Sequence, residues 1–111
     1  MDTNAASVSF AALSQPMRLE VFRLLVRAGK SGMAAGEIST KLDVRQNTMS
    51  ANLSVLLQAG LVRNERQGRV IRYFANIEKM QGLLSFLLEE CCGGQPELCQ
   101  PAIQTIGEEQ E

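Results

Sequence analysis

The sequence contains no histidine, and all three of its cysteines lie within residues 91–99. Without histidine, the chain cannot build the common zinc sites that combine cysteine with histidine, and it has no imidazole to activate a catalytic thiol. The cysteines also form no CxxC pair of the kind that thiol reductases use. These absences disfavour an enzyme and leave the cysteine cluster as the only source of thiolate ligands.

Long apolar runs are absent as well. No stretch approaches the roughly 18 consecutive apolar residues that would span a membrane. The N-terminal segment MDTNAASVSFAAL lacks the basic start and long apolar core of a signal peptide. We therefore expect a cytoplasmic protein with no membrane partner, in which thiols more often bind metals or take part in redox chemistry than form static disulfides.

The net charge of −1 conceals an uneven distribution of charge along the chain. Residues 41–72 hold six Lys or Arg against two acidic residues, whereas residues 73–111 hold seven Glu against a single Lys. An electropositive middle segment beside an acidic one is suited to docking a polyanion. Charge alone leaves open the alternative of a solvated face with no partner.

The spacing of apolar and helix-ending residues predicts one domain of mainly α structure with a β-hairpin. At 111 residues it is large enough for a hydrophobic core and small enough to gain from a partner chain. Pro16 is typical of a first helical turn, Gly29 of a helix end and Gly68 of a hairpin turn. Asn4 and Asn76 are the expected caps of the first and last helices. The predicted helices cover residues 4–13, 16–28, 33–43, 45–59 and 77–92, and the predicted strands cover residues 61–66 and 70–74.

A short helix, a tight turn at Asp43, a longer helix and a two-stranded hairpin indicate a winged helix-turn-helix. The longer helix has a narrow apolar stripe, formed by Met49, Leu53, Leu56 and Leu57. Its remaining side chains are small and polar, and their amides and hydroxyls suit base edges in the major groove, while the hairpin arginines suit phosphates or the minor groove. A surface helix and hairpin of a small α+β domain is the alternative. The expected DNA-binding residues are Arg45, Gln46, Asn47, Thr48, Ser50, Asn52, Arg66, Arg69 and Arg72.

Three segments of the sequence resemble a known family, and they align with the predicted turn, recognition helix and wing. They read LSQPMRLEVFRLL, TKLDVRQNTMSANLSVLLQAGLV and RQGRVIRYFA. Over about residues 10–90, the sequence resembles the ArsR/SmtB family of bacterial metal-responsive repressors. The most specific part is QNTMSANLSVLLQAGLV, because family members carry a similar polar helix followed by LxxAGLV. The resemblance implies a homodimer, built through the helices over residues 4–13 and 77–92, that binds a palindromic operator and leaves it when an inducer binds.

The sequence departs from the family pattern at two of its inducer sites. The helix over residues 33–43 lacks the cysteine-containing motif that many arsenic and cadmium sensors place there, and the last helix lacks the histidine of the family's zinc site. In the recognition helix, Ala51 and Asn52 stand where relatives often carry a longer basic or imidazole side chain. The inducer site is therefore expected elsewhere in the chain.

Cys91, Cys92 and Cys99 supply three soft ligands just after the last predicted helix. A three-coordinate ion such as arsenite or antimonite takes three sulfurs, whereas tetrahedral zinc would need an uncommon fourth ligand from a nearby Glu. Gly93–Gly94 would relax the helix end so that neighbouring cysteines converge. Because the resembled family includes arsenic sensors with C-terminal cysteines, we expect As(III) or Sb(III), inorganic or organic, as inducer, with no constitutive cofactor.

Other uses of the cysteines stay open at this point. They include a redox or persulfide sensor, a site for another soft metal such as Cd, Pb or Cu(I), and small buried residues with no role. We expect residues 1–92 to form the DNA-binding and dimerisation domain and residues 93–111 to form a partly mobile tail that carries Cys99.

Overall fold

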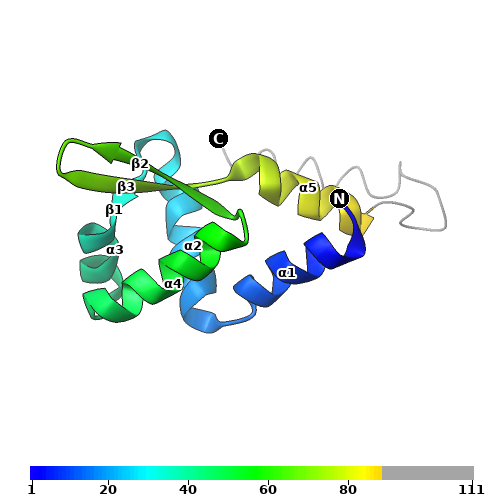
Figure 1. The fold of residues 1–111 in the computed structure, drawn as a ribbon, viewed down its shortest axis with the longest axis horizontal. Coiled ribbons are helices and arrows are strands. Elements are labelled where there is room, and N and C mark those ends of the chain that lie inside the picture. The colour runs from blue at the N-terminus through cyan, green and yellow to red at the C-terminus, as the bar shows by residue number, and fades with distance from the viewer. Residues whose placement is uncertain (89–111) are drawn as a thin grey trace.

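The computed structural model describes residues 1–88 of the chain, which form five α-helices and a three-stranded antiparallel sheet (Figure 1). Their order confirms the predicted winged helix-turn-helix, and the two-residue strand β1 is an element that the sequence did not predict. The elements are α1 (Thr3–Leu13), α2 (Pro16–Ala28), the 3-10 turn η1 (Gly29–Ser31), β1 (Met33–Ala34), α3 (Ala35–Leu42), α4 (Gln46–Gln58), β2 (Val62–Gln67), β3 (Val70–Ala75) and α5 (Ile77–Leu88).

Residues with specific backbone roles set the helix ends. Pro16 occupies the first turn of α2, and Gly29 ends that helix with φ of 60°. Asn76 caps α5 as predicted, because its Oδ1 accepts the backbone N–H of Lys79 at 3.2 Å. The predicted Asn4 cap is wrong: α1 begins earlier, and Asp2 Oδ1 accepts the N–H of Ala5 at 2.7 Å.

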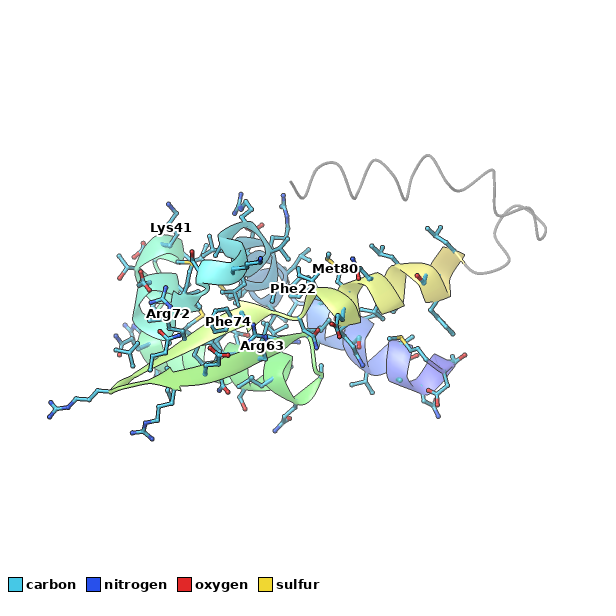
Figure 2. All side chains as sticks on the ribbon, turned by 90° about the horizontal axis from the view of Figure 1, so that it is seen from above. Phe22, Lys41, Arg63, Arg72, Phe74 and Met80 are labelled. Atoms are coloured by element: carbon cyan, nitrogen blue, oxygen red, sulfur yellow. The ribbon has the colours of Figure 1, made fainter. Side chains whose placement is uncertain are left out.

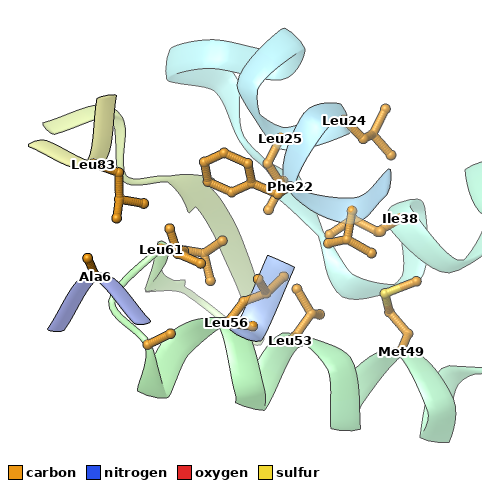
Figure 3. Close-up of a cluster of buried hydrophobic side chains, with 14 residues drawn as sticks. Ala6, Phe22, Leu24, Leu25, Ile38, Met49, Leu53, Leu56, Leu61 and Leu83 are labelled. Carbon is orange, nitrogen blue, oxygen red and sulfur yellow. The ribbon is translucent and has the colours of Figure 1, made fainter. Parts of the chain in front are cut away.

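The hydrophobic core lies between α2, α3, α4 and the sheet (Figure 3). Helix α2 buries Val21, Phe22 and Leu25, whereas Leu19 is exposed. Each fully buried side chain of this size contributes about 1.5–3 kcal/mol to the free energy of unfolding. The α4 stripe is confirmed in large part, since Leu57 is half-buried and the fully buried residues are Met49, Leu53 and Leu56.

The sheet has the strand order β1-β3-β2, and both pairings are antiparallel. Strands β2 and β3 form the predicted hairpin, with Val62 opposite Ala75 and Gln67 opposite Val70. Gly68 in the connecting turn has φ of 67°, a conformation that glycine adopts without a steric penalty. The hairpin extends beyond the helical body and is called the wing below (Figure 1).

Helices α1 and α5 pack together at the end of the molecule opposite the wing (Figure 1). Only small residues of α1 are buried there, such as Ala6, whereas α5 buries Leu83. Some larger apolar residues of these two helices are exposed instead: Val8 is 58% and Leu87 is 56% exposed. The described residues therefore leave an uncovered apolar surface at this end.

Candidate nucleic-acid interface

The helix-turn-helix is formed by α3, the turn at Asp43–Val44, and α4. Asp43 adopts the left-handed conformation with φ of 54°, and the N–H of Val44 donates to the carbonyl of Ser39 at 3.0 Å. This turn redirects the chain so that α4 crosses α3, and the buried side chains of Ile38 and Met49 hold the two helices together (Figure 3). The position of α4 is thus fixed from its buried side.

The outer surface of α4 carries the polar side chains that the sequence predicted to read DNA. The core residues of α4 fix its inner side, so that these side chains point toward solvent or lie at the flanks of the helix. Asn52 is half-buried. The exposed side chains of the predicted DNA-binding set on α4 are those of Gln46, Asn47, Thr48 and Ser50, together with Arg45 at the N-cap position.

Two asparagines on this surface are oriented by hydrogen bonds within α4. Asn47 Oδ1 accepts the N–H of Thr48 at 2.9 Å, and Asn52 Nδ2 donates to the carbonyl of Thr48 at 3.1 Å. The Asn47 amide group and the Asn52 carbonyl oxygen keep hydrogen-bonding capacity toward an outside partner. Amides held in a fixed orientation suit a base edge, because less side-chain entropy is lost when the contact forms.

Two predicted arginines lie at the tip of the wing. Arg66 and Arg69 stand on either side of Gly68, and Arg66 Nε donates to the carbonyl of Gly68 at 3.3 Å. Both side chains are exposed, and neither forms an ion pair with a carboxylate among residues 1–88. Their guanidinium groups therefore present charge at the tip, where a phosphate backbone could meet it.

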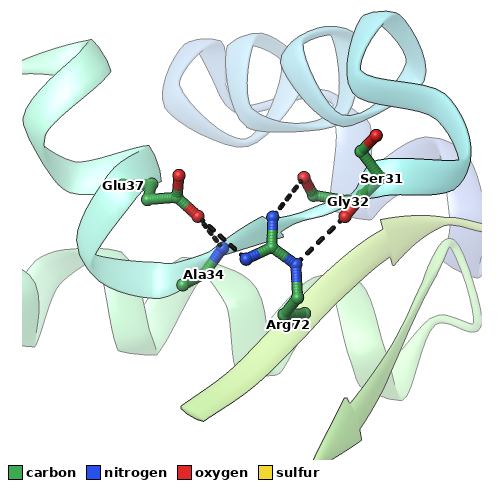
Figure 4. Close-up of polar contacts among 5 residues, drawn as sticks. All are labelled: Ser31, Gly32, Ala34, Glu37 and Arg72. Carbon is green, nitrogen blue, oxygen red and sulfur yellow. Dashed lines mark hydrogen bonds and ion pairs between the residues drawn. The ribbon is translucent and has the colours of Figure 1, made fainter. Parts of the chain in front are cut away.

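Arg72, the third arginine predicted on the wing, is engaged inside the protein (Figure 4). Its Nε donates to the carbonyl of Ser31 at 3.0 Å and its Nη2 donates to the carbonyl of Gly32 at 3.0 Å. Its Nη1 lies 3.3 Å from Oε1 of Glu37, and the Arg72 side chain is only 26% exposed. The sequence did not indicate these partners, because they lie 35 to 41 residues away along the chain.

Arg63 is also paired within the wing. Its Nη1 lies 3.1 Å from Oε1 of Glu65, and its guanidinium stacks over the ring of Phe74 at 4.4 Å from the centroid. Figure 2 shows Arg63, Arg72 and Phe74 at the base of the hairpin, away from its tip. Among the residues that the structure describes, the arginines of the wing that lack a carboxylate partner are thus the two at its tip.

The three cysteines proposed as metal ligands, Cys91, Cys92 and Cys99, lie outside the described residues, as do the end of the predicted last helix and the proposed tail. Within residues 1–88, no group of three His, Cys, Asp or Glu side chains is arranged to hold a metal ion. In the same part of the chain, no helix has the length and hydropathy needed to cross a membrane.

Known proteins share both the sequence pattern and this geometry. The helix-turn-helix domain family HTH_20 matches residues 13–65. The arsenical resistance operon repressor of Bacillus subtilis (strain 168) is 35% identical over 83 residues, covering 75% of this chain and 74% of the relative. The structure of an ArsR-like transcriptional regulator from Rhodococcus sp. RHA1 is 28% identical, with a TM-score of 0.70 over 93% of this chain and 92% of that chain.

A second similar structure is that of a homodimer. It is a homodimeric winged helix-turn-helix DNA-binding domain from Mycobacterium bovis, described as a possible ArsR-family regulator, 26% identical with a TM-score of 0.63. The match covers 78% of this chain and 81% of that chain. With the identity and coverage of the Bacillus repressor and the shared fold, these findings show that the chain belongs to the ArsR family of winged helix-turn-helix transcriptional regulators.

Proposed function

We propose that this protein is a homodimeric repressor that binds operator DNA through α4 and the wing and releases it when As(III) or Sb(III) binds its cysteines. The observation that carries the proposal is the combination of an exposed polar surface on α4 with wing-tip arginines that form no ion pair within residues 1–88. Amides and hydroxyls would read bases in the major groove, while guanidinium groups would hold phosphate or enter the minor groove.

The apolar surface at the α1 and α5 end supports a dimer. Val8, Phe10 and Leu87 are exposed there, and covering them in a second copy would remove apolar area from water. The related Mycobacterium bovis domain is homodimeric. A two-fold dimer would present two copies of α4 to successive major grooves of one palindromic site, about 34 Å apart.

The inducer site is proposed at Cys91, Cys92 and Cys99. The support is chemical, since three thiolates without histidine suit a thiophilic three-coordinate ion, and the Bacillus relative is a repressor of arsenical resistance. Cys91 follows three residues after Leu88, the last described residue of α5, which packs against α1. Binding there would act on the helices proposed to set the spacing of the two α4 copies. A coupling of about 1–3 kcal/mol would weaken DNA binding 5- to 150-fold.

Titrating the DNA complex with arsenite tests this proposal. The wild-type complex is expected to dissociate in a gel shift, with one arsenic bound per cysteine cluster by mass spectrometry. The triple variant Cys91→Ser, Cys92→Ser, Cys99→Ser should bind the same DNA with similar affinity and ignore arsenite. Arsenite release that persists in this variant would show that the inducer site lies elsewhere.

A thiol redox or persulfide sensor is the second candidate, and the clustering of three thiols within residues 91–99 favours it. It predicts release by a mild oxidant or a persulfide donor and rescue by a reductant, with no metalloid present. Cd, Pb and Cu(I) salts form a further arm of the same titration. Release by one of these ions at lower concentration than arsenite would assign the site to that metal.

A further inference from the structure

Arg72 occupies the row of the sheet where the wing leaves the body of the protein. In that row it pairs with Ala34 of β1 on one side and with Glu65 of β2 on the other. The next residues toward the tip, Ile71 and Val70, pair with β2 alone. Beyond Arg72 the wing is therefore a two-stranded ribbon, and such ribbons twist more strongly than wider sheets and are marginally stable by themselves.

The Arg72 side chain crosses from this row to two other elements (Figure 4). Its Nε and Nη2 donate to the carbonyls of Ser31 and Gly32, in the connection between α2 and β1. Its Nη1 faces Oε1 of Glu37, and the same oxygen accepts the N–H of Ala34 at 2.9 Å in the first turn of α3. All three guanidinium nitrogens of Arg72 thus contact other residues of the same chain. Together these contacts join the wing to α3, the first helix of the helix-turn-helix.

We propose that Arg72 and Glu37 are positioning residues that set the direction of the wing and thereby bring Arg66 and Arg69 to DNA. This inference rests on the proposed DNA-binding function. The planar fork of arginine suits the task, because it fixes three partners at once, whereas the point charge of lysine does not. The contribution of Arg72 to DNA affinity then passes through the wing and not through a phosphate contact of its own.

The substitution Glu37→Gln distinguishes a positioning role of Arg72 from a direct phosphate contact, because the two roles predict opposite changes in DNA affinity. The variant removes a negative charge but keeps an oxygen that can accept the Ala34 N–H. If Arg72 bound phosphate directly, losing this carboxylate would free the arginine and strengthen DNA binding. Positioning predicts the opposite: about a tenfold loss of affinity and a salt slope reduced by roughly 1–2, although no cation has been removed.

Arg72→Lys supplies the second comparison, and Glu20→Gln supplies the control. Lysine keeps the charge that a phosphate contact needs, so a direct contact predicts near-normal affinity, whereas positioning predicts a loss close to that of Glu37→Gln. Glu20 pairs with Arg23 at 3.9 Å with both side chains exposed, and its neutralisation is expected to leave affinity unchanged. Urea denaturation of each variant establishes that it is folded at the assay temperature.

Fluorescence anisotropy with a duplex selected from a randomised library by the wild-type protein measures these affinities. Glu37→Gln binding as tightly as wild type, or more tightly, would overturn the positioning role. Hydrogen exchange without DNA is an independent readout, in which residues 66–71 should exchange faster in Glu37→Gln than in Glu20→Gln. Equal exchange in the two variants would also contradict the inference. Failure of wild type to bind any duplex would refute the proposed function instead, and the exchange result would still decide whether Glu37 holds the wing.

Discussion

Gly32→Ala tests how the base of the wing is packed. Gly32 has φ of 60° and ψ of −170°, a region that other residues reach at a cost of about 1–3 kcal/mol. An added Cβ would lie 2.6 Å from Cδ1 and Cε1 of Phe74 and 2.6 Å from the carbonyl oxygen of Tyr73. Phe74 is buried, so moving its ring adds roughly 1–3 kcal/mol of overpacking. The free energy of unfolding is expected to fall by about 2–6 kcal/mol.

Gly29→Ala is the matched control for this substitution. Gly29 also has φ of 60°, but a Cβ added there would meet no atom within 4 Å. The control therefore carries the backbone cost alone, and the difference between the two variants isolates the clash with Phe74 and Tyr73. Since 1 kcal/mol shifts the melting temperature of a small domain by roughly 4–8 °C, circular dichroism melts resolve the difference. Equal melting temperatures for the two variants would refute the packing described for Gly32.

Three further substitutions probe the core, the wing tip and the apolar end. Leu53→Ala should lower the free energy of unfolding by about 2–5 kcal/mol in urea with an unchanged m-value, and a loss below about 1 kcal/mol would contradict its burial. Arg69→Gln should weaken binding to all duplexes alike and reduce the salt slope by about 1, whereas an unchanged slope would exclude a phosphate contact. Leu87→Glu should yield monomers in sedimentation, while Ser85→Glu, on the opposite side of α5, should not; a dimer in both would move the interface elsewhere.

Local signals in the sequence predicted most of the fold. Pro16 and Gly29 mark the ends of α2 by their backbone restrictions, and Met49 and Leu53 follow the helical period that α4 buries. Strand β1 escaped prediction because two residues are too few for an alternating pattern, and its pairing partner Tyr73 lies 40 positions later. The start of α1 was missed because Asp2 offers the same capping chemistry as Asn4 two residues earlier.

The sequence predicted which residues make up the polar surface of α4 and the basic wing. It did not predict that the arginines of the wing have different partners. The polar surface of α4 follows from helical spacing, because fixing the apolar side assigns the rest. By composition alone, Arg69 and Arg72 are equivalent cations on one hairpin. The structure separates them, since Arg72 meets Glu37 and the carbonyls of Ser31 and Gly32 only after β1 pairs with β3, and such long-range contacts leave no periodic signal in the sequence.

The most direct test of the central claim is to select duplexes from a randomised library with the wild-type protein and with Asn47→Ala, and to footprint the selected site. The α4 surface predicts a palindromic site with two protected major grooves about one helical turn apart, and an altered base preference for Asn47→Ala. Two results would contradict the reading of DNA by α4: wild-type protein that binds all duplexes equally, or a triple variant Asn47→Ala, Ser50→Ala, Asn52→Ala that selects the same site as wild type.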